Sequence, residues 1–174
     1  RKKRLVKSKV KIGVLALQGD FAEHISVLDN LNVNCTIVKK PNELSDINGL
    51  IIPGGESTTI KKLIDRYDFE GEIKEKVSLG MSVWGTCAGL ICIAKKLTEP
   101  EPIPMNLINA EVSRNWFGRQ VDSFESDINF IGIEEKIKAV FIRAPIVNKV
   151  SKNVDVLSKL NDGTIVGIKE NKIV

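Results

Sequence analysis

A cysteine set between two glycines is the feature of this sequence that most clearly suggests chemistry. Residues 85–89 read Gly-Thr-Cys-Ala-Gly, with an apolar run before them and a helix-like run after them. This spacing matches a sharp strand-to-helix turn that presents a nucleophile, because glycines allow neighbouring segments to approach closely. The N-terminus of the following helix would favour the thiolate. We therefore predict that Cys87 is an exposed and activated nucleophile; the alternative is a small buried cysteine.

A second glycine-rich loop is a candidate for completing such a site. Residues 53–59 read Pro-Gly-Gly-Glu-Ser-Thr-Thr and follow another apolar run. Paired glycines can turn a backbone N–H outward, so Gly55 and Ala88 are candidates for the two donors of an oxyanion hole. The alternative is an ordinary glycine turn that Ser57 or Thr58 caps.

A nucleophilic cysteine normally works with a histidine base that an acid or amide orients. The only histidine in the sequence is His24, which lies between Phe21, Ile25 and Leu28 in a helix-like segment. This spacing places His24 at the border of a packed helix face. The base is therefore expected outside these residues, unless another group deprotonates Cys87.

Short apolar segments alternate with helical ones in the first half of the chain. Asp20 is a candidate N-cap for the first helix. Strands are expected over 10–17, 35–38, 50–52 and 83–84, and helices over 21–31, 58–78 with a break near 67–71, and 90–97. This alternation predicts a mostly parallel sheet with helices on both faces. Ligands of such sheets bind beyond the carboxyl ends of the strands, where the loops at Gln18, 53–59 and 85–89 would meet.

The second half of the chain changes character and is expected to contain mainly strands. These are predicted over 109–112, 129–133, 139–143, 154–157 and 164–169. No long linker separates the halves, so we expect a basic arm, residues 1–9, followed by one domain over 10–174. Residues 172–174 read as an apolar strand without a following turn. The domain is therefore expected to be C-terminally incomplete and part of a longer chain.

Composition restricts the class of protein further. Six of the 26 Lys and Arg residues lie within the first nine positions, and the others nearly balance the 22 acidic residues. This pattern favours a solvated tail over nucleic-acid binding. Three cysteines without paired spacing favour a reducing compartment, and Cys35 and Cys92 are expected to be packing residues. No apolar run approaches the roughly 20 residues of a membrane span, so we predict a soluble, cytoplasmic protein without membrane contact.

Five motifs, in the same order, resemble the glutaminase subunit of pyridoxal phosphate synthase, within the wider class I glutamine amidotransferases. They are residues 15–19 (Leu-Ala-Leu-Gln-Gly), 53–59, 85–90, 114–120 (Arg-Asn-Trp-Phe-Gly-Arg-Gln) and 141–145 (Phe-Ile-Arg-Ala-Pro). The first three are shared with the wider superfamily, whereas the last two are specific to this subunit. The resemblance covers nearly everything after the basic arm. It implies a flavodoxin-like, three-layer α/β fold with additional strands in the second half.

The resemblance also implies an activity, with no cofactor and no metal. L-glutamine would be hydrolysed to glutamate and ammonia through a thioester, and a partner synthase subunit would use the ammonia to make pyridoxal phosphate. Cys87 would be the nucleophile. The other implied site residues are Gly55, Glu56 and Ser57, which would hold glutamine, Arg114, Ile142 and Arg143 as further substrate contacts, and Gln18 as loop support.

Two roles of the implied Cys-His-Glu triad have no counterpart in these residues. In the family, the histidine and glutamate lie in a His-Pro-Glu sequence just after a strand, and we expect them beyond Val174. Free ammonia would be protonated and diluted in solvent, so a glutaminase of this kind gains from being active only when it is docked to the synthase. We therefore expect docking to complete the oxyanion site. Two alternatives stay open: another cysteine hydrolase on a similar sheet, and a non-catalytic or regulatory partner of the synthase.

Overall fold

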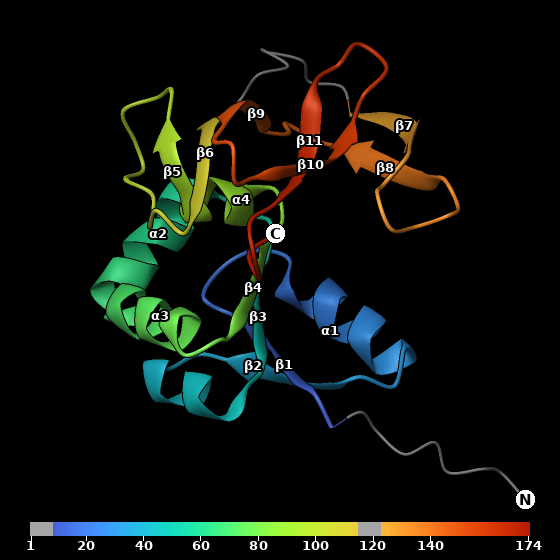
Figure 1. Ribbon diagram of the computed structural model, residues 1–174. Helices are drawn as coiled ribbons and strands as arrows, with labels where there is room; N and C mark the ends of the chain where they lie inside the picture. Colours follow the sequence, from blue (N-terminus) through green and yellow to red (C-terminus); the bar gives the residue numbers. More distant parts are fainter. Residues whose placement is uncertain (1–8, 115–122) are drawn as a thin grey trace, which may run out of the picture. The chain divides into compact units, whose positions relative to one another are not determined.

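The computed structural model describes residues 9–114 and 123–174 of the chain (Figure 1). Most of the basic arm and residues 115–120 of the fourth motif lie outside these ranges. The chain divides into two compact units, Arg1–Gly89 and Leu90–Val174, and each is described by itself. The expectation of a single domain over 10–174 stays a prediction.

The first unit is a parallel sheet between two layers of helices. Its sheet has the strand order β2-β1-β3-β4, and every neighbouring pair is parallel. The elements are β1 (Lys11–Leu15), α1 (Phe21–Asn30), β2 (Asn34–Val38), the 3₁₀ helix η1 (Pro41–Asp46), β3 (Gly49–Ile52), α2 (Ser57–Arg66), α3 (Phe69–Ser78) and β4 (Ser82–Gly85). Helix α1 covers one face, and α2 and α3 cover the other (Figure 1). The predicted mostly parallel sheet with helices on both faces is confirmed.

The core of this unit lies between the sheet and the layer of α2 and α3. All four residues of β3 are buried, as expected for a central parallel strand covered on both sides. Helices α2 and α3 bury Ile60, Ile64, Phe69 and Ile73, each no more than 1% exposed. This packing fixes the carboxyl ends of the strands, from which the candidate loops begin.

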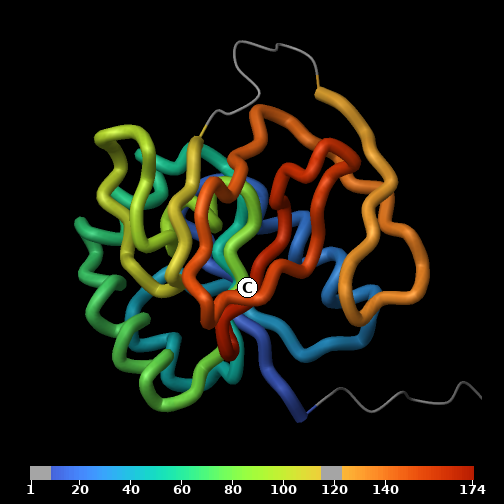
Figure 2. The backbone as a smooth tube through the Cα atoms, turned by 45° about the horizontal axis from the view of Figure 1, so that its top comes forward, coloured from blue at the N-terminus to red at the C-terminus, as the bar shows by residue number. Residues whose placement is uncertain are grey.

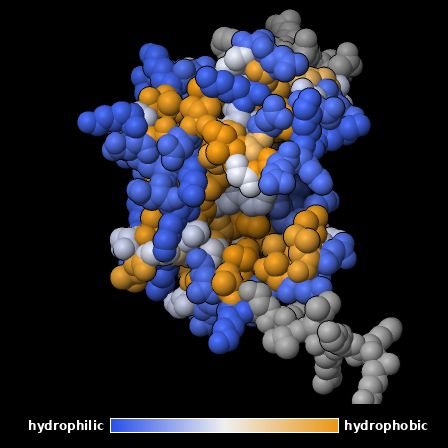
Figure 3. Space-filling view, turned by 45° about the vertical axis from the view of Figure 1, so that its right-hand side comes forward, coloured by the Kyte–Doolittle hydropathy of each residue, from blue (hydrophilic) through white to orange (hydrophobic). Residues whose placement is uncertain are grey.

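Helix α1 is held to the sheet much less deeply. None of its residues is fully buried. Its inner face consists of the half-buried residues Phe21, His24, Ile25 and Leu28, at the spacing of an amphipathic helix. Val27 on the outer side is 57% exposed, and hydrophobic residues form exposed patches on this side of the molecule (Figure 3). The position of α1 therefore depends on a small number of specific contacts.

The second unit is built mainly from strands. Its five-stranded sheet has the order β10-β11-β9-β6-β5, in which only β5 and β6 run parallel, and β7 and β8 form a separate antiparallel ribbon. Figure 2 shows this orange ribbon beside the red β10–β11 hairpin. Phe124 and Phe141 stack across the ribbon with ring centroids 4.8 Å apart. The elements are α4 (Ala88–Ile93), which begins at the end of the first unit, β5 (Ala94–Leu97), β6 (Ile108–Ser113), β7 (Phe124–Ile128), β8 (Ile137–Phe141), β9 (Ile146–Val150), β10 (Asp155–Lys159) and β11 (Ile165–Lys169).

Several predicted elements of the second half are wrong. The helix expected over 90–97 ends at Ile93, and Ala94–Leu97 forms β5 instead, because a short apolar run fits either structure. The strand expected over 129–133 is a turn with Gly132 at a φ of 92°. Its apolar Phe130 packs against the β7–β8 cluster. Strands β7 and β9 were not predicted, and residues 172–174 contain a turn and one isolated bridge at Ile173 instead of a strand.

Candidate active site

Three loops meet at the carboxyl ends of β1, β3 and β4. The backbone N–H of Asp20, in the loop after β1, donates to the Gly54 carbonyl oxygen at 2.9 Å. The N–H of Glu56 donates to Gln18 Oε1, also at 2.9 Å. The third loop, which carries Cys87, lies close to Gly54: a Cβ added to Gly54 would lie 3.5 Å from the Cβ of Cys87. The structure thus brings together the loops that the sequence placed at one sheet edge.

The glycines of these loops are required by close backbone contacts. A Cβ on Gly19 would lie 2.0 Å from the Gly54 carbonyl oxygen, and one on Gly89 would lie 2.0 Å from the Ile52 carbonyl oxygen. A Cβ on Gly55 would lie 2.8 Å from the Gly19 Cα, in addition to 2.6 Å from the side-chain Oε1 of Gln18. No heavier residue fits these positions without moving the backbone, so the glycines set the spacing between the three loops.

Cys87 lies at the strand-to-helix turn in a left-handed conformation, with a φ of 51°, and its side chain is exposed. This conformation is rare and strained for a residue other than glycine. It is held on both sides by backbone hydrogen bonds, from Thr86 N–H to the Ile52 carbonyl at 3.0 Å and from Gly89 N–H to the Thr86 carbonyl at 2.8 Å. The thiol is presented at the turn as the sequence predicted.

The protonation of Cys87 differs from the prediction of an activated thiol. Desolvation by the surrounding protein raises the pKa of Cys87, the Ala88 backbone N–H on the sulfur lowers it, and the Asp20 carboxylate raises it again, for a net increase. The side chain reaches the surface, but enough water is displaced to disfavour the thiolate. Helix α4, whose N-terminus would favour the thiolate, has only six residues. A base must therefore remove the thiol proton before attack.

Asp20 is a site residue that we expected only to cap α1. Its side chain makes no capping hydrogen bond. Instead, Asp20 Oδ2 and Cys87 Cβ lie 3.4 and 3.5 Å from the position that a Cβ on Gly54 would take. The relevant signal was present in the sequence, because Asp20 belongs to a loop at the carboxyl end of a parallel strand.

His24 also contacts the cysteine turn, which the sequence did not predict. Its Nε2 atom lies 3.3 Å from Thr86 Oγ1, and its ring meets Trp84 edge-on with centroids 5.8 Å apart. Burial lowers the pKa of His24, and the carboxylates of Asp20 and Glu23 only partly oppose this. The ring is therefore a neutral neighbour of the turn near pH 7.

The loop after β3 is fixed by a cap at the start of α2. Glu56 Oε1 accepts hydrogen bonds from Thr58 N–H at 3.2 Å and from Thr58 Oγ1 at 2.8 Å. Glu56 is thus the N-cap residue, instead of Ser57 or Thr58 as we considered. Ser57 is 3% exposed, so its hydroxyl is directed into the protein. The candidate donor Gly55 lies directly before this cap.

The remaining candidate residues belong to the second unit. The Arg114 backbone N–H donates to both carboxylate oxygens of Glu99, at 3.1 and 3.2 Å. Its guanidinium donates from Nη1 to the Glu101 carbonyl at 2.9 Å. Ile142 is 63% exposed. Arg143 is exposed and has a φ of 46°, a left-handed conformation like that of Cys87.

The described ranges, 9–114 and 123–174, contain neither a metal-binding cluster nor a membrane-spanning helix. Within them, no group of three or more His, Cys, Asp or Glu side chains is placed to hold a metal ion. In the same ranges, no helix has both the length and the apolar character needed to cross a membrane.

A parallel α/β unit with an exposed cysteine at a strand-to-helix turn is typical of α/β enzymes with a cysteine nucleophile. The family model described as SNO glutamine amidotransferase matches residues 14–174. The chain therefore belongs to the SNO glutamine amidotransferase family.

Individual relatives agree with this membership. A protein of Dehalococcoides mccartyi named pyridoxal 5'-phosphate synthase subunit PdxT is 51% identical over 169 residues, which cover 94% of this chain and 86% of the relative. A protein of the same name from Halalkalibacterium halodurans is 48% identical over 90% of this chain and 80% of its own. A crystal structure described as a glutamine amidotransferase superposes with a TM-score of 0.88 at 43% identity, over 93% of this chain and 86% of that one. PurLQS from Thermotoga maritima, with a TM-score of 0.66 at 16% identity over 95% of this chain and 85% of its own, shares the fold.

Proposed function

We propose that this protein hydrolyses L-glutamine to glutamate and ammonia and passes the ammonia to a pyridoxal phosphate synthase subunit. One observation carries the proposal. Cys87 lies exposed in a left-handed turn, with the Ala88 N–H on its sulfur and the glycine loop of residues 53–55 beside it. Family membership supports glutamine as the substrate, and the names of the relatives support the synthase as the partner.

The chemistry begins with the thiol of Cys87. After a base removes its proton, Sγ attacks the carbonyl carbon of the glutamine side-chain amide. The oxyanion that forms would accept hydrogen bonds from the backbone N–H groups of Gly55 and Ala88. The carbon–nitrogen bond then breaks, and ammonia leaves with the transferred proton. Water hydrolyses the resulting thioester, which releases glutamate and regenerates Cys87.

The α-amino and α-carboxylate groups of glutamine require partners of their own. As the resemblance implies, Gly55, Glu56 and Ser57 would contact the substrate from the loop after β3. Ser57 is buried, and Glu56 caps α2, so backbone groups are the most direct contribution of this loop. Arg114, Ile142 and Arg143 are the proposed contacts from the second unit. A guanidinium suits the α-carboxylate because it can donate two parallel hydrogen bonds.

Gln18 has a supporting role in this proposal. Its Oε1 accepts the Glu56 N–H at 2.9 Å, and its position limits the space around Gly55. This contact holds the loop that carries one proposed oxyanion donor. We place the reaction in the cytoplasm, because the odd number of cysteines is most compatible with a reducing compartment.

Ammonia release measured with and without the synthase subunit tests this function. The full-length protein, with the histidine and glutamate expected beyond Val174, should release ammonia from glutamine, faster with the synthase present, and Cys87→Ser should abolish release. Cys35→Ser is the matched control, since Cys35 lies on β2 and contacts Asp29 on α1. Ammonia release by Cys87→Ser at the wild-type rate would overturn the assignment. Absence of release from every variant, with complex formation intact, would favour the non-catalytic partner.

A further inference from the structure

The residue before Cys87 is fixed at three separate atoms. The Thr86 N–H donates to the Ile52 carbonyl, and the Thr86 carbonyl accepts from Gly89 N–H. The third contact is made by the side chain, whose Oγ1 lies 3.3 Å from His24 Nε2. A non-glycine residue in a left-handed conformation persists only where its surroundings hold it. The His24 contact is the only one of the three that comes from a side chain and can be removed by substitution.

His24 reaches two residues of the strand-to-turn segment at once. Trp84 lies on β4 and Thr86 directly after it, and the side chains of both residues reach His24 on α1. The ring of His24 contacts the indole of Trp84 edge-on and the hydroxyl of Thr86 through Nε2. Since α1 buries none of its residues completely, the two contacts of His24 are specific interactions that connect α1 to the cysteine turn.

We infer that His24 is a positioning residue for Cys87, which it holds in its left-handed turn through the hydroxyl of Thr86. The inference rests on the proposed function and deepens it. His24 touches neither the sulfur nor the substrate in this role. Its neutral ring can accept the Thr86 proton or donate its own, depending on the tautomer. Loss of the contact would let the turn relax and move the sulfur away from the Ala88 N–H, which favours the thiolate.

Variants of His24 and Thr86 separate the hydrogen bond from packing. His24→Phe keeps a ring against Trp84 but cannot bond Thr86, whereas His24→Gln keeps a polar group within reach of Thr86. Thr86→Val removes the hydroxyl with little change of shape. Glu23→Gln is the control, because Glu23 is an exposed neighbour on the same helix. Two rates are measured: ammonia release with the synthase present, and alkylation of Cys87 by iodoacetamide, located by mass spectrometry.

We expect His24→Phe and Thr86→Val each to lower kcat about fivefold with little change of KM, the effect of about one hydrogen bond. The double variant should be no slower than either single one, since both remove the same contact. Alkylation of Cys87 should slow by a similar factor, and its pH profile should move upward. His24→Gln should recover most of both rates, and Glu23→Gln should match the wild type.

Additive losses in the double variant, or wild-type rates in both single variants, would overturn the role of His24. The alkylation measurement does not depend on glutamine. If the wild type releases no ammonia, the proposed function fails, and the alkylation rates still decide whether His24 positions Cys87.

Discussion

At the scale of single residues, the cysteine turn depends on backbone packing that leaves no room for side chains. Gly89→Ala would place a Cβ 2.0 Å from the Ile52 carbonyl oxygen and 2.8 Å from its carbon. Both atoms belong to the backbone of a buried strand and cannot move aside. We expect a loss of about 3 kcal/mol or more in the free energy of unfolding. Urea unfolding of the purified variant measures it.

Gly71 provides a matched control for that substitution. It lies within α3, and a Cβ there would meet nothing within 4 Å. Gly71→Ala should stabilise the protein by about 0.5–1 kcal/mol, because alanine has the higher helix propensity. Equal effects of the two substitutions would show that the close contact at Gly89 is not what makes glycine necessary.

Asp20 sets part of the acidity of Cys87. Its carboxylate raises the pKa of Cys87, because a nearby negative charge disfavours the thiolate. Asp20→Asn should therefore lower that pKa, and alkylation of Cys87 near neutral pH should become about two- to threefold faster, the modest size expected for an exposed charge. The measurement is the alkylation rate as a function of pH. Glu23→Gln is the control, because it removes one negative charge from the neighbouring helix α1 and should leave the pH profile of alkylation unchanged. An equal shift of the pH profile in both variants would contradict a specific role of Asp20.

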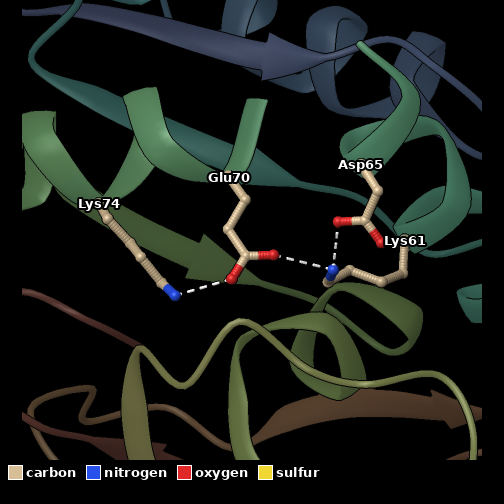
Figure 4. A network of polar contacts seen from close by, with 4 residues as sticks. All are labelled: Lys61, Asp65, Glu70 and Lys74. Atoms are coloured by element: carbon tan, nitrogen blue, oxygen red, sulfur yellow. Dashed lines mark hydrogen bonds and ion pairs between the residues drawn. The ribbon is translucent and has the colours of Figure 1, made fainter. Parts of the chain in front are cut away.

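At the scale of elements, α2 and α3 are joined by a buried lysine. Lys61 is 4% exposed, and its Nζ lies 2.5 Å from Asp65 Oδ1 and 2.8 Å from Glu70 Oε2. Glu70 also pairs with Lys74 at 2.7 Å (Figure 4). Burial opposes the charge of Lys61, but the two carboxylates outweigh it and raise the pKa of Lys61. This network fixes the helix that begins at the loop of Gly55.

Removal of the buried Lys61 charge should lower the free energy of unfolding more than removal of the exposed Lys74 charge. Lys61→Met leaves two carboxylates without their shared partner, and we expect a loss of about 2 kcal/mol in the free energy of unfolding. This is less than for fully buried pairs, because the Asp65 side chain is 56% exposed. Lys74→Met, at a side chain that is 47% exposed, should cost less than about 1 kcal/mol. Urea unfolding of both variants makes the comparison, and a larger loss for Lys74→Met would contradict it.

The same network should make the stability of the protein sensitive to acid. Burial raises the pKa of Glu70, but hydrogen bonds from Lys61 and Lys74 outweigh burial and lower it. A carboxyl whose pKa is lower in the folded state stabilises the fold above its unfolded pKa, and this contribution is lost as the pH falls through the lowered value. The stability difference between wild type and Lys61→Met should therefore shrink below about pH 4, near the ordinary pKa of glutamate. A difference that stays constant in acid would exclude Glu70 as its source.

The elements that the sequence could predict are those with an unambiguous period. Helix α1 and the break between α2 and α3 lie close to the expected positions, because their amphipathic patterns are long. The run at 90–97 was too short to distinguish helix from strand. Strand β7 was missed because three of its five residues are polar and only Ile128 is buried. Pattern alone does not show which partner strand will cover such a segment.

The candidate site was likewise only partly predictable from the sequence. The positions of Cys87 and the glycine turn near Gly55 followed from motif and strand order. The contacts of Asp20 and His24 with the cysteine turn did not, because they depend on the rotation of α1 over the sheet. That rotation is set by packing and not by the helical period of α1 alone. The acidity of Cys87 likewise depends on desolvation, which local sequence does not reveal.

At the scale of the whole molecule, the family match extends over residues 14–174 and so includes both compact units. A ligand that binds the folded chain and not the unfolded one stabilises it in proportion to its occupancy. Cys87→Ala would bind glutamine without turning it over. At 100 times Kd, glutamine should stabilise this variant by about 2.7 kcal/mol. For a chain of 174 residues this corresponds to a rise of roughly 5–10 °C in Tm, measured by calorimetry.

Two comparisons make this shift specific for the proposed substrate. Asparagine is one methylene shorter and should give a smaller shift at the same concentration, because its amide would not reach the cysteine turn while its carboxylate is bound. Arg143→Gly, in the Cys87→Ala background, removes the guanidinium at a residue whose φ of 46° suits glycine. The fold should survive, and the glutamine-induced shift should fall, because the α-carboxylate would lose its cation. An undiminished shift in this variant would remove Arg143 from the proposed substrate contacts, and the absence of any shift in Cys87→Ala would remove glutamine as the ligand of the chain alone.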